Sequence, residues 1–190
     1  MTSLIRPTLV LLLILTAITG VLYPLAITGI SAVVFPGQAA GSLVYDQAGK
    51  AIGSTLIGQS FSDPGHFWSR PSATSARPYN GIASGGSNQG PLNPALTDAI
   101  RIRIRTLQAA DPDNHEPIPV DLVTASGSGL DPEISIAAAN YQADRVARAR
   151  KLNPKVVKAL IQAHARGRVF GLLGEPRVNV LELNLALDAP

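Results

Sequence analysis

The chain of 190 residues contains no cysteine and only three histidines, and both shortages restrict its chemistry. Without cysteine there is neither a disulfide nor a thiolate ligand for a metal, which is compatible with either side of a membrane. His66, His115 and His164 lie far apart and lack the helical spacing of a zinc site. The sequence therefore predicts no metal bound by this chain.

Motifs of common enzyme classes are also missing. There is no Gly-x-Ser-x-Gly nucleophile elbow of a serine hydrolase. Gly49-Lys50 lacks the preceding glycine spacing and the following hydroxyl residue of a phosphate-binding loop. The net charge of +3 is small, and no basic stripe alternates with aromatic residues. We therefore expect no catalytic residues, no cofactor bound by the chain's own chemistry and no nucleic-acid partner.

Charge is absent from a long N-terminal stretch. Arg6 is the only charged side chain before Asp46, and the residues between them are largely apolar as far as Phe35. Since about 20 apolar residues span a bilayer, we expect a transmembrane helix over residues 9–33, embedded in lipid. A cleaved signal peptide is the alternative, with Ala39 and Ala40 near the cleavage site, but its hydrophobic region would normally be only about 7–15 residues long.

The few charges around this span predict its orientation. Arg6 and the α-amino group lie on the N-terminal side, and residues 37–45 carry no charge. Positive charge favours the cytoplasmic side, so we expect a cytoplasmic tail over residues 1–8 and an extracytoplasmic soluble domain over residues 36–190.

Inside the span, Thr16 and Gly20 have the small-xxx-small spacing of packed membrane helices. Pro24 follows four residues later, and a proline kink is tolerated in lipid where neighbouring helices satisfy the freed carbonyl. Thr16, Gly20 and Pro24 are therefore predicted to pack against other helices, although an ordinary bent anchor would show the same pattern.

The remaining length suits one domain, for which we expect an α+β fold. Residues 42–45 and 51–57 read as strands joined by a turn at 46–49. Residues 59–91 are rich in serine, glycine and proline. They also hold most of the domain's aromatic residues, which disordered segments usually lack, so an ordered loop is expected.

Asparagine or aspartate followed by proline predicts helix starts at three places. The first, Asn93-Pro94, opens a helix with one apolar face, although residues 100–105 also alternate like a strand. The other two predicted helices run from Asp131-Pro132 to about Arg150, and from Asn153-Pro154 to about Gly167. The apolar face of the first helix comprises Leu96, Ile100, Ile104 and Leu107.

Two further segments complete the predicted domain. Residues 120–124 read as a strand. Residues 178–187 alternate like a strand, but Asn179 and Glu182 resemble a capping box, which favours a short closing helix.

Two glycine-rich segments lie at residues 84–88 and 126–129. The second could present backbone N–H groups to an anion at a helix N-terminus. A tight turn leading to a capping carboxylate at Asp131 is the interpretation we favour.

Taken together, the ordered motifs resemble the C subunit of the bacterial Kdp potassium-transporting P-type ATPase, over essentially the whole chain. One departure is Glu133, where many relatives have histidine. The matching motifs are YP at 23–24, GSTLIGQSF at 53–61, RPSA at 70–73, PYN at 78–80, SGGSN at 84–88, PVDLVTAS at 119–126, SGLD at 128–131, RVARAR at 145–150 and VNVLELNLAL at 178–187.

The resemblance implies a non-catalytic subunit of a complex in the inner (plasma) membrane that uses ATP to take up K⁺. Its partners would be a channel-like A subunit that binds K⁺ and a B subunit that is phosphorylated and hydrolyses ATP. ATP and K⁺ would be handled by the complex. The C subunit is described as supporting assembly and raising the ATP affinity of the B subunit, which an extracytoplasmic domain could do only indirectly.

The matched motifs also suggest a docking face on the soluble domain. We expect partner contacts through Arg70, Asn80, Asn88, Asp131 and Asn179. A membrane-anchored extracytoplasmic solute-binding or interaction protein is the alternative, and an anchored hydrolase is disfavoured by the missing motifs.

Overall fold

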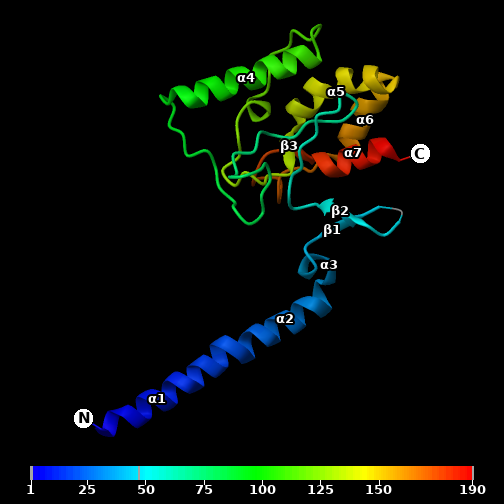
Figure 1. Cartoon of the computed structure of the whole chain (residues 1–190). Coiled ribbons are helices and arrows are strands. Elements are labelled where there is room, and N and C mark those ends of the chain that lie inside the picture. The colour runs from blue at the N-terminus through cyan, green and yellow to red at the C-terminus, as the bar shows by residue number, and fades with distance from the viewer. Residues whose placement is uncertain (1, 47, 190) are drawn as a thin grey trace. The chain divides into compact units, whose positions relative to one another are not determined.

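The computed structural model describes residues 2–46 and 48–189, so residue 47 of the predicted turn and both chain ends lie outside it. The chain divides into two compact units, Met1–Leu43 and Val44–Pro190 (Figure 1). The first is one long apolar helix with a short extension, and the second mixes helices with short strands. The α+β fold is confirmed.

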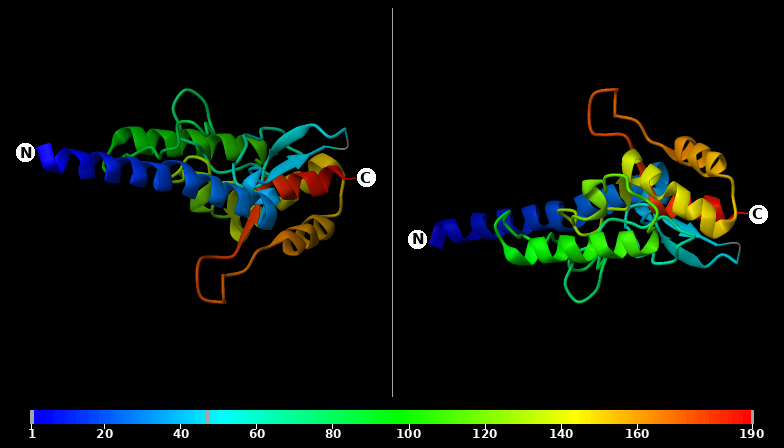
Figure 2. Two further views of the ribbon diagram at one scale, coloured as in Figure 1. Left: turned by 90° about the horizontal axis from the view of Figure 1, so that it is seen from below. Right: turned by 90° about the horizontal axis from the view of Figure 1, so that it is seen from above.

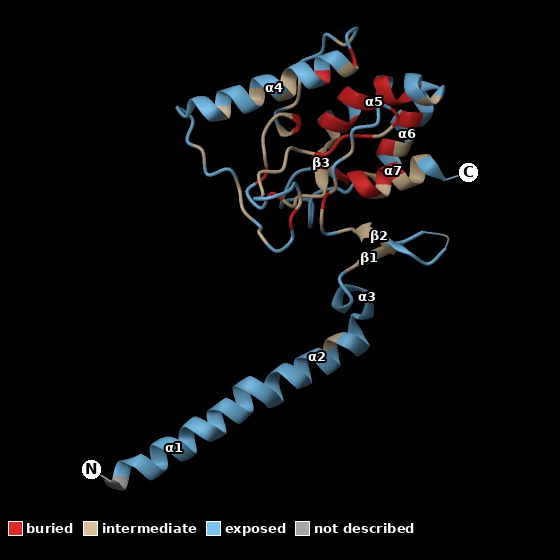
Figure 3. Cartoon of the chain, in the orientation of Figure 1, coloured by how far each residue is buried: buried red, intermediate tan, exposed pale blue. Residues whose placement is uncertain are grey.

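The first unit contains α1 (Thr2–Ala17), a π-helical turn (Ile18–Leu22), α2 (Tyr23–Val34) and α3 (Pro36–Ala39). Its stretch Leu4–Val34 is long and apolar enough to cross a membrane, and extends beyond the predicted span at both ends. The whole stretch is solvent-exposed apart from Ser31, as Figure 3 shows in pale blue. Such a helix needs lipid or other helices around it.

The π turn has a local cause. Pro24 has no backbone N–H, so the carbonyl of Gly20 loses its regular helical partner. The chain responds with a wider turn, in which the backbone N–H of Tyr23 donates to the carbonyl of Ile18, five residues back.

β1 (Leu43–Tyr45) starts at the last residue of the first unit and forms a two-stranded sheet with β2 (Ala51–Ser54). The predicted second strand is too long, since β2 ends at Ser54. There the backbone turns back, and Ser54 bridges to Ile57.

The helix α4 (Pro94–Ala110) is confirmed, and the side chain of Asn93 accepts a hydrogen bond from the N–H of Ala95. On its predicted apolar face only Leu107 is fully buried, and Leu96, Ile100 and Ile104 are half-buried. The predicted strand at 120–124 is wrong, because Val120–Leu122 form a 3₁₀ turn.

A helix starting at Asp131-Pro132 is also wrong. Residues Glu133–Ser135 form β3, and α5 (Ile136–Arg150) begins only after Ser135, whose hydroxyl accepts from the N–H of Ala138. The reason is a distant partner, since β3 pairs antiparallel with β4 (Arg177–Asn179), with Glu133 opposite Asn179 and Ser135 opposite Arg177. Backbone pairing over this distance leaves no local sequence signal.

The last two helices agree better with expectation. The helix α6 (Pro154–His164) has the predicted Asn153 cap, but ends three residues before Gly167 because Ala165 is already extended. In α7 (Val180–Asp188), Asn179 accepts from the N–H of Glu182, as in the predicted cap, while the strand-like start of this segment is β4.

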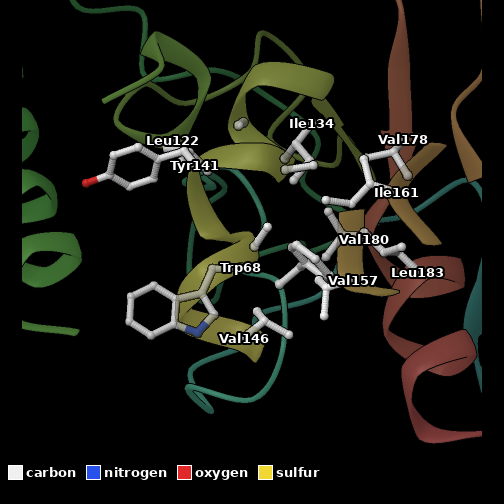
Figure 4. Close-up of a cluster of buried hydrophobic side chains, with 14 of the residues drawn as sticks. Trp68, Leu122, Ile134, Tyr141, Val146, Val157, Ile161, Val178, Val180 and Leu183 are labelled. Carbon is white, nitrogen blue, oxygen red and sulfur yellow. The ribbon is translucent and has the colours of Figure 1, made fainter. Parts of the chain in front are cut away.

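The core of the second unit lies between α5, α6, α7 and the two-stranded sheet β3–β4 (Figure 4). Alanines along α5 let its neighbours approach closely, and the loop after β2 adds the buried side chains of Phe67 and Trp68. This confirms that the long loop is ordered and packs on the domain. The labelled core side chains are Trp68, Leu122, Ile134, Tyr141, Val146, Val157, Ile161, Val178, Val180 and Leu183.

Candidate functional site

Two buried amides fasten the long loop to the helices. The side chain of Gln142 on α5 accepts from the backbone N–H of Trp68 at 2.8 Å and donates to its carbonyl at 3.2 Å. Asn184 on α7 does the same for Phe67, at 2.8 and 3.0 Å. Each side-chain amide therefore pairs a backbone N–H and a carbonyl of the loop, which a neighbouring β-strand would otherwise do.

The indole of Trp68 lies near two guanidinium groups. The Arg145 group is 4.5 Å from the ring centroid and the Arg103 group 5.5 Å, within the range of cation–π attraction. Arg145 also donates to the carbonyls of Pro64 and His66, and Arg103 to those of Ser69 and Leu122. These contacts fix the backbone on both sides of Trp68.

Burial lowers the pKa of both arginines, that of Arg145 to about 10. Arg145 therefore keeps its charge at neutral pH. The loop is thus held by charged donors that bind backbone carbonyls, which gives it a defined course up to Arg70.

Arg70 and Asp131, both predicted site residues, form an ion pair with 2.8 Å between Nη1 and Oδ2. Asp131 also accepts from the N–H of Glu133, so it closes a turn before β3 and does not cap a helix. The hydroxyl of Tyr79 donates to the carbonyl of Arg70, and burial raises the pKa of Tyr79. Tyr79 therefore holds the Arg70 side of the ion pair, and the turn before β3 holds the Asp131 side.

Beside this ion pair lies a groove of about 430 Å³. Its apolar lining comes from Pro119, Val120, Ile134, Ala137 and Pro176, and its other lining residues are Arg70, Asp121, Asp131, Glu133, Ser135, Glu175 and Arg177. A lining that combines apolar and charged side chains is the composition of a protein–protein contact.

A chain of ion pairs extends from this groove, and sequence reasoning missed it. Arg177 pairs with Glu133 across β3 and β4, and Arg166 pairs with both Glu133 and Glu182. The one usable signal was the alternation of polar residues, among them Arg177 and Glu182, with valine and leucine over residues 177–185. These pairs brace the sheet that carries the groove.

The three predicted asparagines have separate positions. Asn80 is buried and stabilises its own loop, donating to the carbonyl of Ser75. Asn88 is exposed and has a left-handed backbone, with φ of 53°. Asn179 is buried, caps α7 and donates to the carbonyl of Thr55 at 2.8 Å. Asn179 lies opposite Glu133 in the β3–β4 pair, which places it near Asp131. Asn88 lies in the long loop before α4.

The two glycine-rich segments pack against each other. The N–H of Gly85 donates to the carbonyl of Ser128 at 2.9 Å, and Gly129 closes a turn with Ser126. A Cβ atom on Gly129 would lie 2.7 Å from the carbonyl oxygen of Gly85, and its φ of 66° favours glycine as well. Glycine is needed here for close backbone packing in a tight turn.

In the first unit, the predicted packing residues share one side of the helix. A Cβ atom on Gly20 would lie 4.0 Å from the Thr16 side chain, and Pro24 follows the π turn. All three are exposed. Their small side chains form a row along the helix, and another helix could approach closely there.

A second hollow, of about 720 Å³, lies between the end of α4 and the outer face of α5. Its lining is strongly polar, with Asp111 buried and paired with Arg148. No group of three or more potential metal ligands occurs among residues 2–46 and 48–189.

Comparison with known proteins covers both units. The family model KdpC, described as the c chain of a K⁺-transporting ATPase, matches residues 5–189. A Variovorax paradoxus protein is 64% identical over 100% of this chain and 97% of its own length, and one from Dechloromonas aromatica is 62% identical over 100% and 98%. A Methylococcus capsulatus protein is 59% identical over 97% and 96%. All three are named potassium-transporting ATPase KdpC subunits. The chain therefore belongs to the KdpC family.

Proposed function

We propose that this chain is the non-catalytic subunit of an ATP-driven K⁺ uptake complex. The observation that carries the proposal is the match with the KdpC family over residues 5–189, which includes the apolar helix as well as the soluble domain. Relatives that are 64% and 62% identical over 97% and 98% of their own length carry the name of a potassium-transporting ATPase subunit.

In this proposal the apolar helix crosses the inner membrane once, with Arg6 on the cytoplasmic side and the domain outside. The row of Thr16, Gly20 and Pro24 packs against helices of a channel-like, K⁺-binding subunit. The mixed apolar and charged lining of the groove beside Arg70 and Asp131 supports a docking face on the domain.

The effect on ATP is indirect. An extracytoplasmic domain cannot reach cytoplasmic nucleotide, so the chain raises the ATP affinity of the phosphorylated catalytic subunit by stabilising the assembled complex. Such an effect requires the chain to make stronger contacts with the ATP-bound state of the complex than with its ATP-free state.

Purification of the tagged chain from native membranes in mild detergent tests assembly. A channel-like subunit and a P-type ATPase should be recovered with it, and Arg70→Ala should lower their yield several-fold because the docking face loses one of its two arginines. Arg101→Ala is the matched control, since Arg101 forms an exposed pair with Asp98 outside the groove.

Thermal unfolding of the purified variants separates docking from folding. An exposed ion pair contributes at most about 1 kcal/mol, so the partly exposed Arg70 pair should change stability only modestly. Undiminished recovery of both partners with Arg70→Ala would remove Arg70 from the docking face. Recovery of the wild-type chain alone, as a stable monomer, would contradict the proposed function.

A further inference from the structure

The segment between α6 and β4 projects from the domain as a narrow hairpin, which both views of Figure 2 show in orange. At its base Arg166 and Arg177 exchange two backbone hydrogen bonds, of 2.8 and 3.0 Å. Nearer the tip, Val169 pairs with Leu173. Residues 169–173 are called the apolar finger below.

The apolar finger exposes large hydrophobic side chains without any polar one between them. Phe170 is 90% exposed, Leu172 80% and Leu173 64%, and Val169 is about half exposed. Glycines occupy positions 171 and 174. A contiguous exposed apolar surface of this kind marks a site of contact with a protein or a membrane.

Backbone strain accompanies the exposure. Phe170 has φ of 54°, in the left-handed region that bulky residues avoid, and Gly171 follows with φ of 74°. Strained residues of this type concentrate at functional positions. The turn therefore holds an exposed aromatic ring at a conformational cost.

The hydrogen bonds of the apolar finger suit a water-poor environment. Val169 and Leu173 bond to each other through both N–H groups, at 2.9 and 3.0 Å. The N–H of Gly171 donates to Arg168, and that of Leu172 to Val169. Four of the five backbone N–H groups of the apolar finger are therefore paired within the hairpin, which lowers the cost of moving it from water into lipid.

Charged pairs surround the base of the hairpin. Arg166 pairs with Glu182, Arg168 with Glu175 and Arg177 with Glu133. Arginines next to an apolar tip match the headgroup region of a bilayer, where guanidinium groups bind phosphate.

Chain length keeps the domain near a membrane if the apolar helix is inserted in one. Only residues 35–43 connect α2 to the domain, and nine residues span at most about 30 Å. Tethering raises the effective concentration of lipid, so a weak contact suffices. A five-residue tip is small against the roughly 1,200–2,000 Å² of a stable protein interface.

We propose that the apolar finger inserts into the lipid interface of the membrane that anchors the chain, with Phe170 deepest and the arginines at the headgroups. The proposal rests on the anchoring in the proposed function. It gives the soluble domain a second attachment to the bilayer and restricts its tilt.

The absence of cysteine allows a direct test with single labels. Full-length Phe170→Cys, carrying an environment-sensitive fluorophore, is reconstituted into vesicles of phosphatidylethanolamine and phosphatidylglycerol that contain spin-labelled lipid. Leu92→Cys, in a loop position that is 96% exposed, is the control. Lipid quenching at position 170 should exceed that at position 92 several-fold; equal quenching, with both labels open to iodide, would overturn the proposal.

A third label, Leu13→Cys, reports insertion of the helix. Quenching there without quenching at position 170 would reject the apolar finger and leave the anchor intact. No quenching at position 13 would contradict the anchor, and the proposal would fail with it.

The same labels can be read in the purified complex. Shielding of position 170 from both lipid and iodide would show that a protein covers the apolar finger, and would also overturn the proposal. Phe170→Asn tolerates the left-handed backbone, so the fold should persist while lipid quenching of a label at Leu172→Cys falls.

Discussion

Gln142 is buried, and its two hydrogen bonds to the backbone of Trp68 tie the long loop to α5. It also accepts from a guanidinium N–H of Arg145 at 2.8 Å. Replacing it with leucine would leave these groups without partners in the core.

We predict that Gln142→Leu destabilises the domain by at least ~2 kcal/mol, because each buried unsatisfied group costs about 1–3 kcal/mol. Denaturant unfolding of the full chain in detergent, followed by the fluorescence of Trp68, measures it. Gln162→Leu on the exposed face of α6 is the control and should have little effect. Equal stability of the two variants would show that Gln142 does not fasten the loop.

Residues whose partners are close in sequence could be predicted, and those with distant partners could not. The caps Asn93, Asn153 and Asn179 each bond to an N–H two or three residues away, and all three were expected. Gln142 and Asn184 bond to residues 74 and 117 positions away. No local pattern marks them as different from solvated amides.

At the scale of elements, Asn179 joins the start of α7 to the loop that follows β2. It caps α7 and donates to Thr55 from inside the core, whereas Asn153 caps α6 from an exposed position. Asn179→Ala should cost about 2–3 kcal/mol, since it loses a cap and a buried hydrogen bond.

Asn153→Ala should cost about 1 kcal/mol, because it loses only the cap. Urea unfolding of the two variants compares them directly. A cost for Asn179→Ala no larger than that for Asn153→Ala would mean that the bond to Thr55 contributes nothing.

The misassigned elements share one cause. Residues 120–124 and 131–135 have sequences that suit other local structures, but β3 finds its partner in β4, more than forty residues away. Asp121 then accepts from both the N–H and the hydroxyl of Ser135, which fixes the 3₁₀ turn against the sheet. Long-range pairing overrides local preference here.

The long apolar helix offers a matched pair of glycines. If Gly20 lies against another helix, Gly20→Leu should lower the yield of assembled complex several-fold, because close approach needs a small residue. Gly29→Leu is the control, since it lies outside the row formed with Thr16 and Pro24 and has open space around it. Co-purification of the partner subunits measures both, and an equal yield would exclude helix packing through Gly20.

At the scale of the whole molecule, the sequence patterns predicted the α+β class, which is confirmed. Over the first 43 residues hydropathy is high and Arg6 is the only charged side chain, and the structure assigns Met1–Leu43 to a unit of its own. The groove beside Arg70 and Asp131 could not be located in advance, because its lining comes from four separate stretches of chain.

We propose that this chain is a required, non-catalytic subunit of the transport complex. The most direct test of this proposal is K⁺-stimulated ATP hydrolysis by complexes purified from cells with and without the chain, measured over a range of ATP concentrations. We predict that complexes lacking the chain lose assembly or show a several-fold higher KM for ATP, and that the chain restores both when added back. Full K⁺-stimulated activity with an unchanged KM for ATP in the absence of the chain would contradict its role as a required subunit.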